Sequence, residues 1–177
     1  PEDLCASPEM VAQGYAGGVP MGGDLAAQPE QGKAPRFVIS AQQDAGDPGQ
    51  PGTPLQRLQL IKGWYADGEL REQVLDVAGG ANDATVDIST CERVGSGHAN
   101  LCTVWEDADF DPDAAAFYYT RVIENPSCRW SQYVCNDAGV DCADPASMKE
   151  GLEGCCSADH QPTLQERAWS SPIWYTP

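Results

Sequence analysis

Eight cysteines in a chain of 177 residues set the strongest limit on what this sequence can fold into. They are Cys5, Cys91, Cys102, Cys128, Cys135, Cys142, Cys155 and Cys156. An even number of cysteines in an acidic, lysine-poor chain is typical of an oxidising compartment, where thiols pair as disulfides. A zinc knuckle would need short Cys-x-x-Cys hooks, and the sequence contains none. We therefore predict disulfides, and a periplasmic or extracellular location.

The pairing of these cysteines is not determined by the sequence, because eight cysteines can combine in on the order of 100 ways. One pair has a local rationale. Cys91 and Cys102 bracket a Gly-rich turn between two strand-like runs, and a bridge there would close a hairpin and stabilise it by about 3 kcal/mol. We prefer this pair, and we expect the cysteines after residue 125 to pair mostly among themselves, with Cys5 reaching in from the N-terminus.

The net charge of the chain limits the classes of molecule that it can bind. Its formal net charge is −17, and such a surface repels nucleic acid and anionic lipid. No apolar run approaches the length of a membrane span. We expect neither a nucleic-acid partner nor a membrane-spanning segment. The chain starts at Pro1 without an initiator Met, which suggests a mature or cleaved piece of a longer protein.

Short strands joined by turns are the dominant local pattern. Gly (18) and Pro (14) are frequent, which favours turns over long helices. Runs rich in β-branched and aromatic residues, or alternating with period two, indicate strands. They cover residues 36–41, 55–64, 69–77, 84–88, 101–105, 115–124 and 172–176. A helix over 69–78 is the alternative for one run, but Ala66-Asp67-Gly68 is a hairpin turn signal.

We predict a mostly β fold: an antiparallel β-sandwich with long Gly/Pro-rich and disulfide-rich loops. Residues 1–34 form an ordered Gly/Pro-rich loop segment, 35–124 the sandwich body, and 125–177 a cysteine-rich loop with a final strand, all in one domain. The five tryptophans would form a sugar-stacking platform if exposed, and core or interface packing is the alternative.

The acidic stretch 106–113 is the most site-like feature of the sequence. Asp107, Asp109 and Asp111 alternate along it, and carboxylates at such positions can bind Ca²⁺. The EF-hand pattern is absent, because Pro112 and Tyr118 stand where that loop needs Gly and Glu. A solvated acidic loop between two strands is the alternative interpretation.

Four blocks of the chain resemble a known family. Residues 14–25, 54–64, 109–112 with 116–130, and 166–174 are similar, in the same order, to the C-terminal part of domain-of-unknown-function family 3604. That family resembles the polymerase-and-histidinol-phosphatase (PHP) superfamily of metal-dependent phosphoesterases. Its histidine-rich metal motifs lie in an N-terminal barrel, whereas this chain has only His98 and His160.

The resemblance implies a C-terminal β-sandwich accessory region of a secreted PHP-like metal-dependent hydrolase. It implies no catalytic residues and no cofactor in this chain, and a divalent metal in the missing N-terminal part. The partner would be the catalytic portion or chain of the same precursor, with a homo-oligomer as a further option. Met21 and Asp24, in the glycine-rich turn, are the candidate interface residues. The alternative is a non-catalytic extracellular protein that serves a structural or assembly role or binds carbohydrate or calcium.

Overall fold

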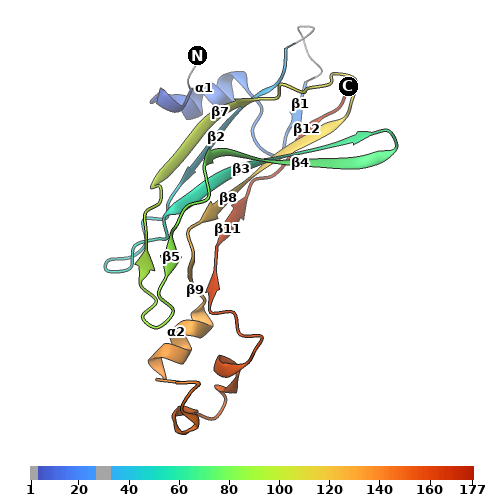
Figure 1. Cartoon of the computed structure of the whole chain (residues 1–177). Coiled ribbons are helices and arrows are strands. Elements are labelled where there is room, and N and C mark those ends of the chain that lie inside the picture. The colour runs from blue at the N-terminus through green and yellow to red at the C-terminus, as the bar shows by residue number, and fades with distance from the viewer. Residues whose placement is uncertain (1–3, 27–32) are drawn as a thin grey trace.

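The fold of this chain is mostly β, as predicted, in a computed structural model that describes residues 4–26 and 33–177 (Figure 1). The strands are β1 (Asp24–Leu25), β2 (Arg36–Gln42), β3 (Leu55–Ala66), β4 (Glu69–Gly79), β5 (Thr85–Val86), β6 (Arg93–Val94), β7 (Asn100–Glu106), β8 (Ala116–Glu124), β9 (Ser127–Cys128), β10 (Thr163–Leu164), β11 (Arg167–Trp169) and β12 (Ile173–Tyr175). The helices are α1 (Met10–Gly17) and α2 (Trp130–Asp137), with 3₁₀ turns at Leu4–Ala6, Pro145–Ser147 and Glu153–Cys156. Within the described ranges, none of the helices has the length and apolar character that a membrane crossing requires.

A six-stranded sheet forms the body. Its strands run in the order β1-β12-β8-β3-β4, and β11 pairs with the end of β8 beyond β12. Every pairing in it is antiparallel except that of β1 with β12. The long strands β3 and β8 lie at its centre because they carry the densest apolar and aromatic runs of the chain.

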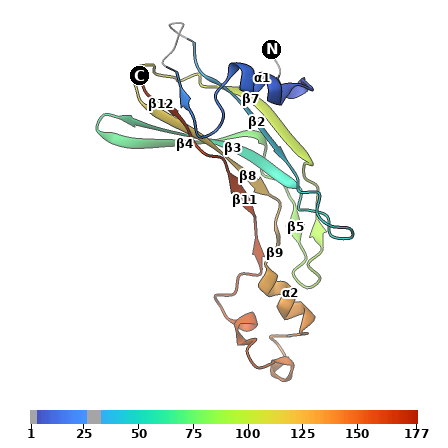
Figure 2. The same cartoon turned by 180° about the vertical axis from the view of Figure 1, so that it is seen from behind.

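A second layer, the antiparallel pair β2–β7, packs on one face of this sheet (Figures 1 and 2). Side chains alternate between the two faces of a strand, so β2 contributes Phe37 and Ile39 to the core and β8 contributes Ala116 and Tyr118. The buried cluster consists of Phe37, Ile39, Leu55, Leu58, Leu60, Leu101, Ala116, Tyr118 and Tyr175.

The β3–β4 hairpin is confirmed, and the alternative helix over 69–78 is wrong. Asp67 and Gly68 connect the strands with φ of 55° and 83°. Two central residues at positive φ are characteristic of the type I′ turn, whose twist matches the twist of the flanking strands. The strand predicted over 84–88 is shorter than expected, since only Thr85–Val86 pairs, with Arg93–Val94 of β6.

Two helices replace parts of the predicted loops. Helix α1 lies within the predicted loop segment 1–34, of which residues 1–3 and 27–32 lie outside the described residues. Helix α2 begins the cysteine-rich stretch, which forms a separate lobe at the far end of the molecule from α1 (Figure 1). The short ladder β9–β10 connects this lobe to the sheet.

The preferred disulfide, Cys91 to Cys102, is wrong. Cys102 pairs with Cys5, and Cys91 pairs with Cys128. The reason is topological: Cys102 lies in β7, whose partner strand is β2, whereas Cys91 lies at the turn between β5 and β6, next to β9. The other bridges, Cys135–Cys155 and Cys142–Cys156, lie within the lobe, as expected for most of that group.

All eight cysteines are therefore paired in four disulfides. Stable disulfides of this number indicate a compartment other than the reducing cytosol.

Candidate functional site

A buried ionic cluster lies where β3, β8 and the loop after β7 meet. Lys62 Nζ is 2.6 Å from Asp107 Oδ2, and the hydroxyl of Tyr118 donates to the same oxygen at 2.6 Å. The Lys62 ammonium also donates to the main-chain oxygen of Asp109 at 3.0 Å, and it lies 5.4 Å from the centre of the Trp64 ring. The side chains of Lys62 and Asp107 are 7% and 3% exposed. Their charges are thus compensated inside the protein, as buried charges must be.

This cluster orders the acidic stretch that the sequence singled out. Asp107 Oδ1 accepts from the main-chain nitrogen of Asp109, and Asp111 Oδ1 accepts from that of Asp113. Among the described residues, no three His, Cys, Asp or Glu side chains are grouped so that they could hold a metal ion. The Ca²⁺ site at Asp107, Asp109 and Asp111 stays a prediction, and Asp107 could take part in it only by giving up its contact with Lys62.

The cluster has a measurable pH signature. Burial, and then the hydrogen bond to Asp107, raise the pKa of Tyr118 far above the ordinary range of a tyrosine hydroxyl. Above about pH 10 the folded chain keeps a proton that the unfolded chain loses, so the free energy of unfolding falls as the pH rises. We expect Tyr118→Phe to make this fall shallower by up to about 1.4 kcal/mol per pH unit. Urea unfolding between pH 8 and 11 measures it, and equal slopes in both proteins would contradict the assignment.

A large apolar groove lies between the N-terminal segment and the β-sheet layers. Its volume is about 710 Å³. One wall comes from α1 and the glycine-rich segment after it, including Met10, Tyr15 and Met21, and the other from β2 and the edge near Ile173. Since most lining side chains are apolar, the groove is suited to apolar or aromatic groups of a partner.

The glycine-rich segment follows the sheet closely, which explains its composition. Gly22 has φ of 89°, a conformation that favours glycine, and its nitrogen donates to the oxygen of Pro172 at 3.0 Å. A Cβ on Gly23 would collide with Val19. These two contacts hold the segment after α1 against the residue before β12 and against its own preceding turn. Of the candidate interface residues, Met21 and Asp24 are both exposed, and Asp24 lies beside Trp174.

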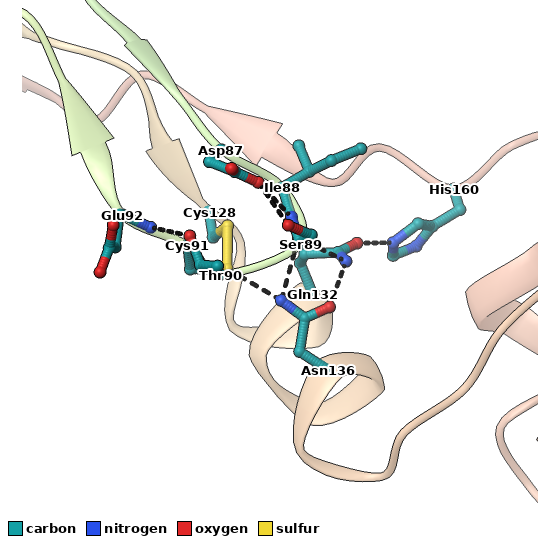
Figure 3. The surroundings of a disulfide bond; sticks show 10 residues. All are labelled: Asp87, Ile88, Ser89, Thr90, Cys91, Glu92, Cys128, Gln132, Asn136 and His160. Carbon is teal, nitrogen blue, oxygen red and sulfur yellow. Dashed lines mark hydrogen bonds between the residues drawn. A yellow bond between two sulfur atoms is a disulfide. The ribbon is translucent and has the colours of Figure 1, made fainter.

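The cysteine-rich lobe is tied to the β5–β6 turn by the Cys91–Cys128 bridge (Figure 3). Asn136 on α2 donates to the oxygen of Ile88 at 2.9 Å, and Gln132 donates to Asn136 at 2.8 Å. His160 Nε2 is 2.8 Å from Gln132 Oε1.

In the same turn, the side-chain and main-chain hydrogen bonds from Ser89 lower the pKa of Asp87. The Cys91–Cys128 bridge and the hydrogen bond from Asn136 to Ile88 fix the lobe to the body. His160 joins the same network through Gln132. The other histidine, His98, pairs with Leu55 through its main chain.

Sequence reasoning missed Lys62 and Tyr118 as partners of Asp107. A signal was available, because Lys62 interrupts the apolar face of β3 at a position that the period-two pattern assigns to the core.

Four disulfides, a β2–β7 layer on a mostly antiparallel sheet and a separate cysteine-rich lobe define the chain as a disulfide-bonded β protein of an oxidising compartment. It belongs to the family described as a protein of unknown function (DUF3604), whose model matches residues 1–177. No curated protein and no solved structure gives a significant match.

Proposed function

We propose that this chain is the C-terminal β accessory region of a secreted, PHP-like metal-dependent hydrolase, and that its groove side packs against the catalytic portion. In this proposal the metal ligands belong to the rest of the precursor, and the metal would supply an activated water for the hydrolysis of a phosphate ester or a related bond. The role of this chain is to support the catalytic portion and to shape the rim of its pocket.

The observation that carries the proposal is the exposed apolar wall of the groove. Val11, Tyr15 and Met21 are 63%, 71% and 65% exposed, although they belong to one short segment beside an apolar groove. Large apolar side chains grouped in this way mark protein–protein contacts more often than a free surface. Aromatic residues and Met are also enriched in the centres of interfaces.

The anchoring of this segment supports the same role. The Cys5–Cys102 bridge holds its start to β7, and the pairing of β1 with β12 holds its end to the sheet. A surface fixed at both ends loses little conformational entropy on binding. It is therefore suited to permanent contact with a second folded unit.

The proposal is tested by placing a charge on the groove in the full gene product. We expect Met21→Asp to lower hydrolysis of p-nitrophenyl phosphate in the presence of Mn²⁺ by about tenfold or more, because it buries a charge in the contact. Val94→Asp is the matched control, since Val94 is 55% exposed on β6, outside the residues that line the groove. It should leave the rate unchanged.

Two results would contradict the proposal. One is a full gene product that neither binds a divalent metal nor hydrolyses any phosphate ester. The other is equal activity of the Met21→Asp and Val94→Asp proteins. Circular dichroism of both variants shows whether the disulfide-bonded fold is retained.

A further inference from the structure

The sheet has a second face, turned away from β2 and β7, which we call the outer face. On β8, Phe117, Tyr119 and Arg121 alternate with the core residues and therefore point to this face. The register places Trp174 of β12 opposite Phe117, and Trp169 of β11 opposite Arg121. Trp174 comes from β12, between β1 and β8, and Trp169 from β11. Both lie on the same side as these β8 residues.

One half of the outer face is an aromatic surface. The Phe117 and Tyr119 rings are 6.3 Å apart with planes 13° from parallel, and the Phe117 and Trp174 rings are 5.4 Å apart. The neighbouring strand carries Gly63 opposite Phe117, where a Cβ would collide with the Phe117 ring. The absence of a side chain at this position lets the ring lie over the backbone of β3.

Phe117 and Tyr119 are half-buried, and the two tryptophans of the outer face are open to solvent. Trp174 is 47% exposed and Trp169 is 57% exposed. Beneath the rings, Ile61 of β3 is only 1% exposed, although it lies outside the core cluster on the other face. Neighbouring side chains of the outer face therefore cover Ile61, whereas the two tryptophans remain accessible.

The other half of the outer face is basic. Arg57, Arg121 and Arg167 share it through the register of β3, β8 and β11. Gln59 Oε1 accepts from Arg121 Nε at 2.8 Å, and Gln59 Nε2 donates to Asp76 Oδ1 at 2.7 Å.

Asp76 is the one carboxylate among these side chains, and its Oδ2 is 3.6 Å from Arg57. The acids Asp24 and Glu72 lie at the opposite end, beside Trp174 and Gly63. Three arginines grouped against one carboxylate are notable in a chain with a net charge of −17.

We propose that the outer face binds an acidic glycan, meaning a polysaccharide that carries carboxylate or sulfate groups. The apolar C–H faces of sugar rings pack on exposed aromatic rings, and guanidinium groups form paired hydrogen bonds with carboxylate or sulfate oxygens. Arg121 has five N–H donors, and its hydrogen bonds to Gln59 leave others free for a ligand. The net charge of −17 disfavours every polyanion, nucleic acid included, so the attraction has to come from the local group of arginines.

This proposal does not depend on the accessory role, because among the residues named for the outer face only Tyr119 also lines the groove. The test is affinity electrophoresis of the full protein through gels containing polygalacturonate, dextran sulfate or unmodified dextran. We expect retardation by at least one of the two acidic polymers and none by dextran. The polymer that retards identifies carboxylate or sulfate as the acidic group, and retardation should weaken with added salt.

Variants assign the binding to the outer face. We expect Trp169→Ala and Trp174→Ala each to weaken binding about tenfold, as loss of a central aromatic contact does, and Arg167→Gln to reduce its salt dependence. The matched controls are Trp130→Ala and Arg129→Gln, at the start of α2 in the cysteine-rich lobe. Trp130 is 79% exposed, so its removal tests whether any exposed tryptophan suffices.

Three outcomes would overturn the proposal. These are migration unaffected by both acidic polymers, equal retardation by dextran, and weakening by Trp130→Ala as large as that by Trp169→Ala. A further result would overturn it as well. If another part of the precursor shields Trp169 and Trp174 from a chemical oxidant when no glycan is present, the outer face is a protein interface. None of these results bears on the Met21 test.

Discussion

Replacing Asp107 by Asn lowers the free energy of unfolding by about 3–5 kcal/mol, the largest effect that we expect from a single side chain. Asparagine keeps the size of the residue and an oxygen that can accept hydrogen bonds. It removes the negative charge that lies 2.6 Å from the Lys62 ammonium. Because Lys62 is buried on the core face of β3, its charge is then left without compensation. Urea unfolding near neutral pH measures the loss.

A double variant separates the charge from the packing. Lys62→Met with Asp107→Leu removes both charges, and replacing a buried ion pair by apolar side chains is often neutral or stabilising. We expect it to be more stable than Asp107→Asn alone. Asp109→Asn is the matched control, because Asp109 contacts Lys62 only through its main-chain oxygen. It should change stability by less than about 0.5 kcal/mol, and an equal loss in both Asn variants would contradict a buried ion pair.

The second large effect is expected from the Cys5–Cys102 bridge. It joins residues 97 positions apart, and in the chain-entropy model a loop of about 100 residues corresponds to a stabilisation of about 4.7 kcal/mol. Replacing both cysteines by Ser should lower the melting temperature and expose the segment around α1 to proteases. That segment forms one wall of the groove, so the substitution also tests how the groove is held.

The Cys142–Cys156 bridge provides the matched control. It closes a separation of only 14 residues inside the cysteine-rich lobe, for which the same model gives about 3 kcal/mol. We expect its removal to leave the segment around α1 protected. Equal protection of that segment in both double-serine proteins would show that β1 and the apolar contacts hold it without the bridge.

The strands could be predicted because their signals are local. The alternation in 55–64 and the aromatic, β-branched run 115–124 identify β3 and β8 before any contact is known. The Asp67-Gly68 turn identified the hairpin for the same reason.

Helix α1 could not be predicted in this way, since it contains Gly14 and Gly17, which are poor helix formers. Its neighbours at Leu4–Ala6 are attached to β7 by a disulfide. Helix α2 carries Cys135, which pairs with Cys155. Both helices are therefore stabilised by disulfides to residues distant in sequence, and local helix propensity alone does not predict them.

By itself, the sequence determined the oxidising compartment, the mostly β architecture, the positions of the long strands and the family resemblance, because each depends on residue type or on spacing along the chain. The tertiary structure alone decided which cysteines pair, that Asp107 contacts Lys62, and that Trp169 and Trp174 share a face with Arg121. These are contacts between distant residues. They follow from the order and register of the strands, and a one-residue change of register would turn every side chain of a strand to the opposite face.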